Sequence, residues 1–274
     1  MDVFPADWLG ICRRAVAAQR AIFDEVRGAE ARTVYEGVGE GGDRTLVIDR
    51  RCEDAVFSEL EALAAEGASF VAVSEERGEV AFGSGDWSAG IIVDPIDGSL
   101  NARRTIPSHS LSVAVASGPS MADVDFGYVF DFGAGEEFVA RRGGGATLGG
   151  EPIRVAPQTA GKLEVVGAEA AEPERVLPVL EALAGQVYRL RVVGSLAITG
   201  AYVAAGRFDG MLGLRPCRSV DIAAAQLIVR EAGGMVAFGD LSLEEASLGL
   251  DARYPIAAAA DQPGLELIRG AQQA

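Results

Sequence analysis

The stretch GIIVDPIDGSLN, residues 90–101, joins an apolar strand to two closely spaced aspartates, and it decides the fold that we predict. We expect the strand to end at Asp94, because the proline that follows lacks a backbone donor and interrupts regular pairing. Asp97 can then turn back toward Asp94. Gly98 lets a ligand approach the backbone closely, and Ser99 adds a hydroxyl and an N–H group.

Two carboxylates at one strand end repel each other unless a cation or a proton separates them. An oxygen-rich set of this kind suits Mg²⁺ or Mn²⁺, which prefer carboxylate, carbonyl and water ligands. The structural alternative is an Asp-Pro turn with a capping aspartate, which needs no metal.

Further acids stand at the ends of other predicted elements. Glu75 and Glu76 directly follow the apolar run 70–73. Asp221 lies in the first turn of a predicted helix, for which Ser219 is the candidate N-cap. Each acid also has a structural explanation: a solvated strand end for the glutamates, and pairing with the helix dipole for Asp221. Together with Asp94 and Asp97, however, they place several acids at the ends of predicted elements, and separate structural explanations account for such a set less well than a shared metal site does.

The order of predicted elements indicates an α/β protein with an α+β N-terminal lobe, residues 1–155, and an α/β C-terminal lobe, residues 156–274. From about residue 160 onward, strands alternate with helices. The predicted strands are 70–73, 91–93, 111–115, 124–129, 137–140, 163–166, 187–193, 208–212 and 255–260, with a glycine-rich hairpin at 141–155. The predicted helices are 7–27, one opening at Asp49, 172–184, 196–205, 220–232 and 264–269.

Charge and composition exclude several classes of function. The 274 residues include 24 basic and 40 acidic side chains, and the net charge of −16 would repel the phosphate backbone of nucleic acid. The single histidine, His109, excludes metal sites that need two histidines. Three scattered cysteines and the lack of an 18-residue apolar stretch predict a cytoplasmic protein without a membrane partner.

The glycine-rich segment GVGEGG, residues 37–42, matches the dinucleotide-binding pattern GxGxxG. In that pattern a helix must follow the glycines, whereas the next residues, DRTLVID, are typical of a strand. We therefore favour a mobile surface loop over a dinucleotide site.

Three ordered motifs resemble those of the inositol monophosphatase-like, metal-dependent phosphatases over most of the chain. DPIDGSLN corresponds to the family's DP(I/L)DGTxN, VSEE to its GEE element, and VDIAAAQLIVREAGG to WDxAAGxLIxxEAGG. The resemblance implies a layered αβαβα fold, usually dimeric, that hydrolyses small phosphate monoesters. It also implies Mg²⁺ as cofactor, with two or three ions, for which Mn²⁺ may be substituted.

The resemblance also assigns roles to individual residues. The implied metal ligands are Glu75, Asp94, Asp97, Asp221 and the carbonyl of Ile96. The implied catalytic residues are Glu75 and Ser99, which polarise the attacking water, and Thr45 and Asp49, which with Asp43 match a flexible loop near the metals. The implied phosphate- and substrate-binding residues are Asp97, Gly98, Ser99, Arg191, Gly194, Ser195, Arg215 and Asp221.

The residues expected to contact the substrate resemble those of the archaeal and thermophile branch of the family, which hydrolyses both fructose 1,6-bisphosphate and inositol 1-phosphate. Animal-type relatives carry an acid before the last motif, but Leu214, Arg215 and Pro216 stand there in this chain. With Arg191, Arg215 suits a second phosphate better than a sugar hydroxyl. Three alternatives stay open: an adenosine 3′,5′-bisphosphate nucleotidase, a histidinol-phosphatase, and a non-enzymatic regulator that keeps the fold.

Overall fold

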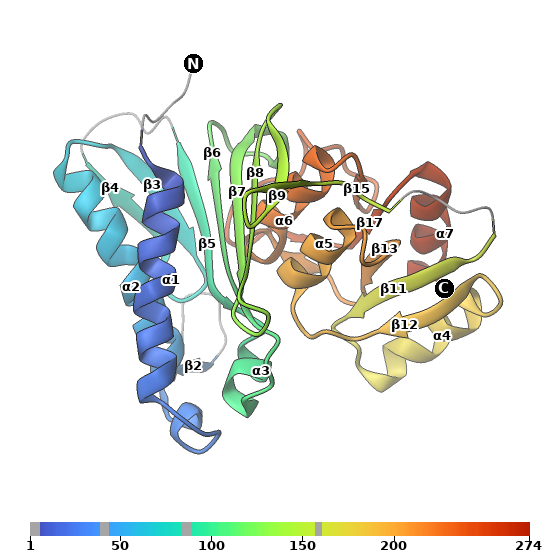
Figure 1. Cartoon of the computed structure of the whole chain (residues 1–274), viewed down its shortest axis with the longest axis horizontal. Helices are drawn as coiled ribbons and strands as arrows, with labels where there is room; N and C mark the ends of the chain where they lie inside the picture. The colour runs from blue at the N-terminus through green and yellow to red at the C-terminus, as the bar shows by residue number, and fades with distance from the viewer. Residues whose placement is uncertain (1–5, 39–43, 84–88, 157–160) are drawn as a thin grey trace.

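The computed structural model describes residues 6–38, 44–83, 89–156 and 161–274, which form five layers (Figure 1). One pair of helices covers the outer face of a large sheet, a second pair lies between the two sheets, and a third covers the outer face of a smaller sheet. In this order the pairs are α1 (Trp8–Glu25) with α2 (Val47–Ala65), α5 (Leu196–Ala204) with α6 (Ser219–Glu231), and α4 (Pro173–Leu183) with α7 (Gln262–Gln272). The predicted α/β class and layered αβαβα fold are confirmed.

The large sheet places the ends of two acid-bearing strands at one edge. Its spatial order is β10 (Glu151–Ile153), β9 (Gly145–Leu148), β8 (Glu136–Arg141), β7 (Val124–Asp131), β6 (Ser110–Ala116), β5 (Gly90–Asp97), β3 (Phe70–Ser74) and β4 (Gly78–Phe82). Neighbouring strands are antiparallel except β3 and β5, which pair in parallel. Because parallel strands finish at the same edge, the residues at the ends of β3 and β5 lie side by side.

The smaller sheet comes entirely from the C-terminal half. Its order is β12 (Val187–Arg191), β11 (Leu163–Glu169), β13 (Gly210–Gly213), β17 (Ile256–Ala259) and β15 (Met235–Phe238). Two antiparallel ribbons complete the strands: β1 (Tyr35–Val38) with β2 (Arg44–Leu46), and β14 (Cys217–Arg218) with β16 (Arg253–Tyr254). The remaining short elements are the helix α3 (Ser99–Arg104) and two 3₁₀ turns, Ala31–Thr33 and Met121–Asp123.

Helix α6 joins the two halves through one core. Ten of its 13 residues are buried. The apolar cluster around it includes Ile92 from the large sheet and Ala258 from the smaller one. A Cβ atom at Gly127 of β7 would lie 2.7 Å from the carbonyl oxygen of Ala224, so only glycine permits this close approach of strand and helix. The two sheets divide near residue 155, but their shared core argues against independent folding, and the division into lobes stays a prediction.

The structure corrects two local predictions. Strand β5 does not end at Asp94: after an irregular register, its pairing with β6 resumes at Asp97, opposite Ser110. Ser219 is the first residue of α6 and not its N-cap. Its hydroxyl instead donates to the carbonyls of Leu248 and Gly249, both at 3.0 Å. None of the described helices is both long and apolar enough to cross a membrane.

Candidate active site

Three carboxylates from distant parts of the chain meet at the edge where β3 and β5 end. Glu75 follows β3, Asp94 lies in β5, and Asp221 occupies the first turn of α6. Each offers one carboxylate oxygen, and these three oxygens lie within 4.8 Å of one another. The parallel pairing of β3 with β5 explains the first two positions, and the burial of α6 against the large sheet explains the third.

This cluster is electrostatically costly without a cation. Asp94 is only 3% exposed, and burial raises the pKa of its carboxyl well above the ordinary value, reinforced by the charges of Glu75 and Asp97. Burial likewise raises the pKa of Asp221. Arg218 donates to Oε1 of Glu75 and is the one cation that the described residues place in an ion pair with this cluster.

A neighbouring acid has an unsatisfied oxygen at the same place. Asp49, in the first turn of α2, accepts from the Leu46 N–H at 3.3 Å through Oδ2. Its Oδ1 is buried and has no hydrogen-bond partner among the described residues. Burial, followed by the charge of Glu76, raises the pKa of Asp49 to about 7. An orphaned oxygen beside three converging carboxylates, with no nitrogen or sulfur ligand, fits a hard divalent cation.

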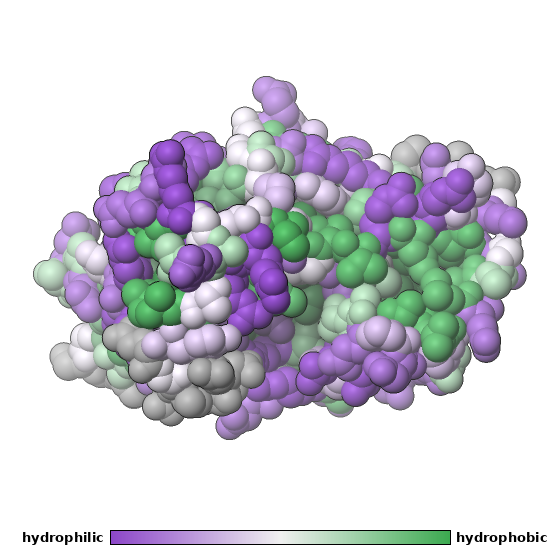
Figure 2. Space-filling view, turned by 90° about the horizontal axis from the view of Figure 1, so that it is seen from below, coloured by the Kyte–Doolittle hydropathy of each residue, from purple (hydrophilic) through white to green (hydrophobic). Residues whose placement is uncertain are grey.

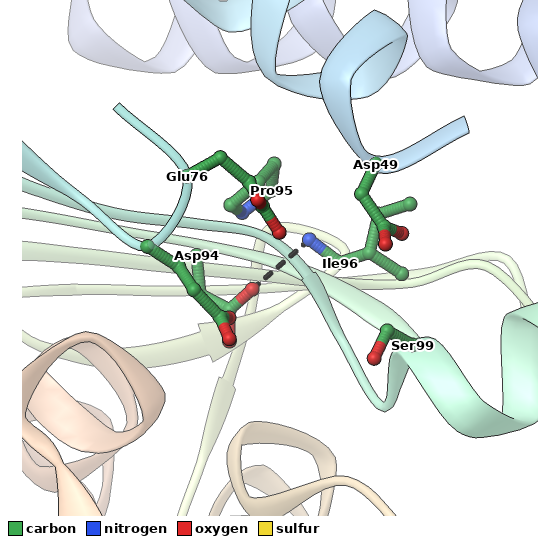
Figure 3. Close-up of a pocket in the computed structure, with 7 residues that line it drawn as sticks. Asp49, Glu76, Asp94, Pro95, Ile96 and Ser99 are labelled. Carbon is green, nitrogen blue, oxygen red and sulfur yellow. Dashed lines mark hydrogen bonds between the residues drawn. The ribbon is translucent and has the colours of Figure 1, made fainter. Parts of the chain in front are cut away.

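Asp49, Glu75 and Asp94 line a hollow of about 100 Å³ beside a cleft of about 420 Å³, which we call the main cleft and which Asp221 lines. In Figure 3, Asp49, Asp94 and Ser99 point toward the hollow from α2, β5 and the start of α3. The hollow is lined by Asp49, Glu75, Glu76, Asp94, Pro95, Ile96 and Ser99. The main cleft is lined by Glu75, Asp94, Ile96, Asp97, Gly98, Ser99, Leu100, Ala170, Leu196, Arg215, Pro216, Cys217, Arg218, Asp221 and Arg253.

Asp97 lies outside the three-carboxylate cluster and is held by the start of α5. Its Oδ2 accepts from the Ala197 N–H at 2.7 Å and from the Ser195 hydroxyl, and its Oδ1 accepts from the Leu196 N–H at 3.3 Å. Ser195 is also the N-cap of α5. The structure thus brings Asp97 and Ser195 into direct contact across 98 residues of sequence.

Close backbone contact explains the glycine that follows Asp97. Gly98 has φ +87°, in the left-handed region, and a Cβ there would lie 2.8 Å from the carbonyl oxygen of Gly194. The predicted phosphate-binding residues Gly98 and Ser99 therefore stand beside the predicted substrate residues Gly194 and Ser195.

A buried glutamate that the sequence analysis missed supports this turn. Glu169, at the end of β11 and 1% exposed, accepts from the N–H groups of Val193 at 3.0 Å and Gly194 at 2.7 Å, and from the Thr199 hydroxyl at 2.7 Å. Burial raises the pKa of Glu169 to about 7. Its sequence signal is weak, because it stands three residues after the predicted strand 163–166, although it is the last residue of β11.

The predicted substrate arginines lie in different surroundings. Arg215 lines the main cleft and pairs with Glu172 at 3.0 Å. Arg191 is exposed on β12, donates to the carbonyl of Leu190 at 2.9 Å, and is not among the residues that line the cleft. The side chain of Thr45, like the whole of Asp43, lies outside the described residues.

His109 is buried away from the main cleft. Its ring packs between aromatic rings, with centroids 4.9 Å from Phe23 and 5.5 Å from Phe132. Burial lowers the pKa of His109 to about 4, so the imidazole is neutral near pH 7.

Comparisons with known proteins agree on one family. A sequence model of the inositol monophosphatase family matches residues 10–271. A fructose-1,6-bisphosphatase/inositol-1-monophosphatase from Methanothermobacter thermautotrophicus is 35% identical over 241 residues, 84% of this chain and 83% of that protein. An inositol-1-monophosphatase from Mesorhizobium japonicum is 35% identical over 202 residues, 71% of this chain and 72% of that protein. The fold is similar to a crystal structure described as an inositol monophosphatase–fructose 1,6-bisphosphatase, with a TM-score of 0.83 and 25% identity, covering 97% of this chain and 100% of the other.

Proposed function

The chain belongs to the inositol monophosphatase family, and from this premise we propose that it is a Mg²⁺-dependent phosphatase of small sugar or inositol phosphates. The observation that carries the proposal is the convergence of Glu75, Asp94 and Asp221 beside the orphaned oxygen of Asp49. Hydrolysis of a phosphate monoester is among the slowest uncatalysed reactions, so the main task of such a site is to neutralise charge on the phosphate.

Each residue of the site then has a role. Glu75, Asp94 and Asp221 hold the metal, together with Asp97 and the carbonyl of Ile96. A divalent metal bound there activates water and stabilises the charge of the transferred phosphate. Ser99 and Glu75 orient the attacking water, and Thr45 and Asp49 act with them, as the family resemblance implies.

Substrate contacts follow from the neighbouring elements. The N–H groups of Gly98 and Ser99 bind the reacting phosphate. Asp97, which α5 holds in place, contacts the substrate with Gly194, Ser195 and Asp221. Arg215 lines the same cleft and would contact a second phosphate, with Arg191 as a further candidate.

We propose fructose 1,6-bisphosphate and inositol 1-phosphate as substrates. The relative from Methanothermobacter carries both activities in its name, and the main cleft presents Arg215 where an acid would suit an inositol hydroxyl. The described cleft residues include no aromatic side chain on which an adenine could stack, which disfavours a nucleotidase. All the metal-binding acids that the resemblance implies are present, which disfavours a regulator without activity.

We also propose that the protein is a cytoplasmic homodimer. Each subunit would consist of the two lobes 1–155 and 156–274. The support for this proposal is the family resemblance and an exposed apolar surface on α4 and β12. Leu177 of α4, Tyr188 of β12 and Val192, which follows β12, are each at least 60% exposed, and Figure 2 shows apolar surface on this side of the molecule. Sedimentation should give twice the chain mass.

The test of the function compares wild type with Asp94→Asn in a substrate panel at saturating Mg²⁺. The panel contains fructose 1,6-bisphosphate, inositol 1-phosphate, adenosine 3′,5′-bisphosphate and histidinol phosphate. We expect the variant to lose turnover by orders of magnitude while its circular dichroism stays unchanged. Asp240→Asn, at a side chain that is 92% exposed on the surface, is the matched control. Wild-type rates in Asp94→Asn, or full activity in excess chelator, would refute the metal mechanism.

A further inference from the structure

A small ribbon in the wall of the main cleft carries two arginines directly opposite each other. Arg218 of β14 pairs in register with Arg253 of β16, and both line the cleft. In an antiparallel pair, directly opposite residues project from the same face of the ribbon, where like charges destabilise each other. Such a pair therefore needs anionic groups nearby.

Arg218 has its anionic group within the chain, because it is paired with Glu75. Arg253 does not: within the described chain it forms no ion pair with a carboxylate. Its hydrogen bonds there all use Nη1, which donates to the carbonyls of Leu250 at 2.6 Å and Ala252 at 3.0 Å. These two bonds hold the guanidinium in place and leave Nε and Nη2 to meet a ligand.

Arg215 adds a second positive charge that a ligand could recruit. It lines the same cleft and pairs with Glu172, but both side chains are about half exposed, at 55% and 48%. Exposed pairs of this kind contribute little and exchange readily. The cleft thus holds the carboxylates that follow β3 and lie in β5 and α6, the Arg218–Glu75 pair, and two further arginines, Arg215 and Arg253.

A metal-binding acid cluster and two further arginines in one cleft suit a ligand that carries two phosphates. A cleft of about 420 Å³ is within the range that holds small ligands. Guanidinium groups bind phosphate oxygens in pairs, through charge-assisted hydrogen bonds. One phosphate would lie at Ser99 and the metal-binding acids, and the other at the arginines.

We propose that Arg253, assisted by Arg215, binds the distal phosphate of a sugar bisphosphate and so determines the preference for a bisphosphate over a monophosphate. The inference rests on the proposed function, and it names the substrate class of the same site. It assigns the distal phosphate to a residue that lies 38 positions beyond Arg215 in the sequence and reaches the cleft only through the β14–β16 pairing.

The experiment measures kcat and KM for fructose 1,6-bisphosphate and inositol 1-phosphate in wild type, Arg253→Ala and Arg253→Lys. For Arg253→Ala we expect kcat/KM on the bisphosphate to fall about 10- to 100-fold, mostly through KM, the size of one charge-assisted contact. Hydrolysis of inositol 1-phosphate should stay within about twofold, and Arg253→Lys should recover part of the loss because it keeps the charge. Fructose 6-phosphate, which retains the distal phosphate, should inhibit inositol 1-phosphate hydrolysis with a Ki raised by a similar factor in Arg253→Ala.

Arg189→Ala is the matched control, since Arg189 is exposed on β12 outside the main cleft and donates only to a neighbouring carbonyl. It removes the same charge and should leave both substrates unaffected. Equal losses on both substrates in Arg253→Ala, no loss on either, or a wild type that uses only inositol 1-phosphate would overturn the inference alone. A wild type that hydrolyses neither substrate would overturn the proposed function and the inference with it.

Discussion

Replacing Asp221 with asparagine should change the thermal stability in opposite directions with and without Mg²⁺. Burial, then the charges of Asp97 and Glu75, raises the pKa of Asp221 from 3.8 to about 7. At pH 8 the ionised carboxylate therefore costs the folded protein up to about 4 kcal/mol, at about 1.4 kcal/mol per pH unit. Because Asp221 is partly exposed and water screens its charge, we expect the substitution to recover about 1–3 kcal/mol.

The asparagine should fit the site without strain. The backbone N–H of Arg218 donates to Oδ2 of Asp221 at 2.8 Å, and the carbonyl oxygen of asparagine can accept the same bond. In excess chelator, Asp221→Asn should thus melt several degrees above wild type, at about 2–4 °C per kcal/mol.

Mg²⁺ should reverse the order of the two melting temperatures, so that wild type melts above Asp221→Asn. A ligand at 100 times its Kd stabilises the folded state by about 2.7 kcal/mol, which wild type should gain in full. The variant lacks one carboxylate of the cluster, binds the cation more weakly, and should gain much less. The two proteins should therefore show a crossing of Tm as Mg²⁺ is added.

The assay is thermal melting at pH 8 across a Mg²⁺ titration, with Asp240→Asn as the control. Asp240 is exposed and pairs with Arg269 on the surface, so its variant should follow wild type at every Mg²⁺ concentration. A Tm of Asp221→Asn below wild type in chelator, together with an equal gain in Mg²⁺, would refute the reasoning.

Three further predictions address the catalytic serine, the buried glutamate and pH. Ser99→Ala should lower kcat about 100-fold or more, while Ser99→Thr should stay active; initial rates decide, and an active alanine variant contradicts the assignment. Glu169→Gln should lower kcat/KM about tenfold on both substrates. The glutamine carbonyl can still accept from Val193 and Thr199, but its amide group cannot accept from the Gly194 N–H. Unchanged kinetics would show that Glu169 does not position the turn at Gly194. In chelator, the free energy of unfolding should fall as pH rises from about 5 to 8, because the pKa values of Asp49 and Glu169 are raised to about 7 and the folded chain keeps protons that the unfolded chain has released. His109 opposes this trend below about pH 6.5, where the unfolded imidazole holds a proton that the buried imidazole lacks, but the two acids outweigh it. Urea titrations that show rising stability above pH 7 would contradict the expectation.

Sequence periodicity predicted most of the strands and helices because one face or both faces of each are buried. It failed where the structure depends on contacts between distant segments. The return of β5 to regular pairing at Asp97 depends on Ser110 of the neighbouring strand, which the local Asp-Pro signal does not contain. Helix α3 has six residues and begins at a left-handed glycine, too short for a periodic pattern to show.

Local motifs indicated some of the site residues, whereas others can be recognised only once contacts between distant segments are known. Glu75, Asp94 and Asp221 stand in recognisable motifs at element ends, and the structure brings them together. Glu169 follows the predicted strand 163–166 by three residues, so the sequence analysis left it outside that strand. The cross-strand pairing of Arg253 with Arg218 joins positions that no local pattern relates.

The mutual repulsion of the acids explains why their supporting elements are so apolar. Asp221 is held at the cluster by α6, whose buried residues Ile222, Leu227 and Ile228 each contribute about 1.5–3 kcal/mol of burial energy. That gain is repeated along a helix buried between two sheets, so we expect the few kcal/mol that the ionised carboxylates cost to leave the fold in place without a cation. Metal binding should then relieve repulsion within a folded chain, with chelation lowering Tm but leaving the circular dichroism unchanged.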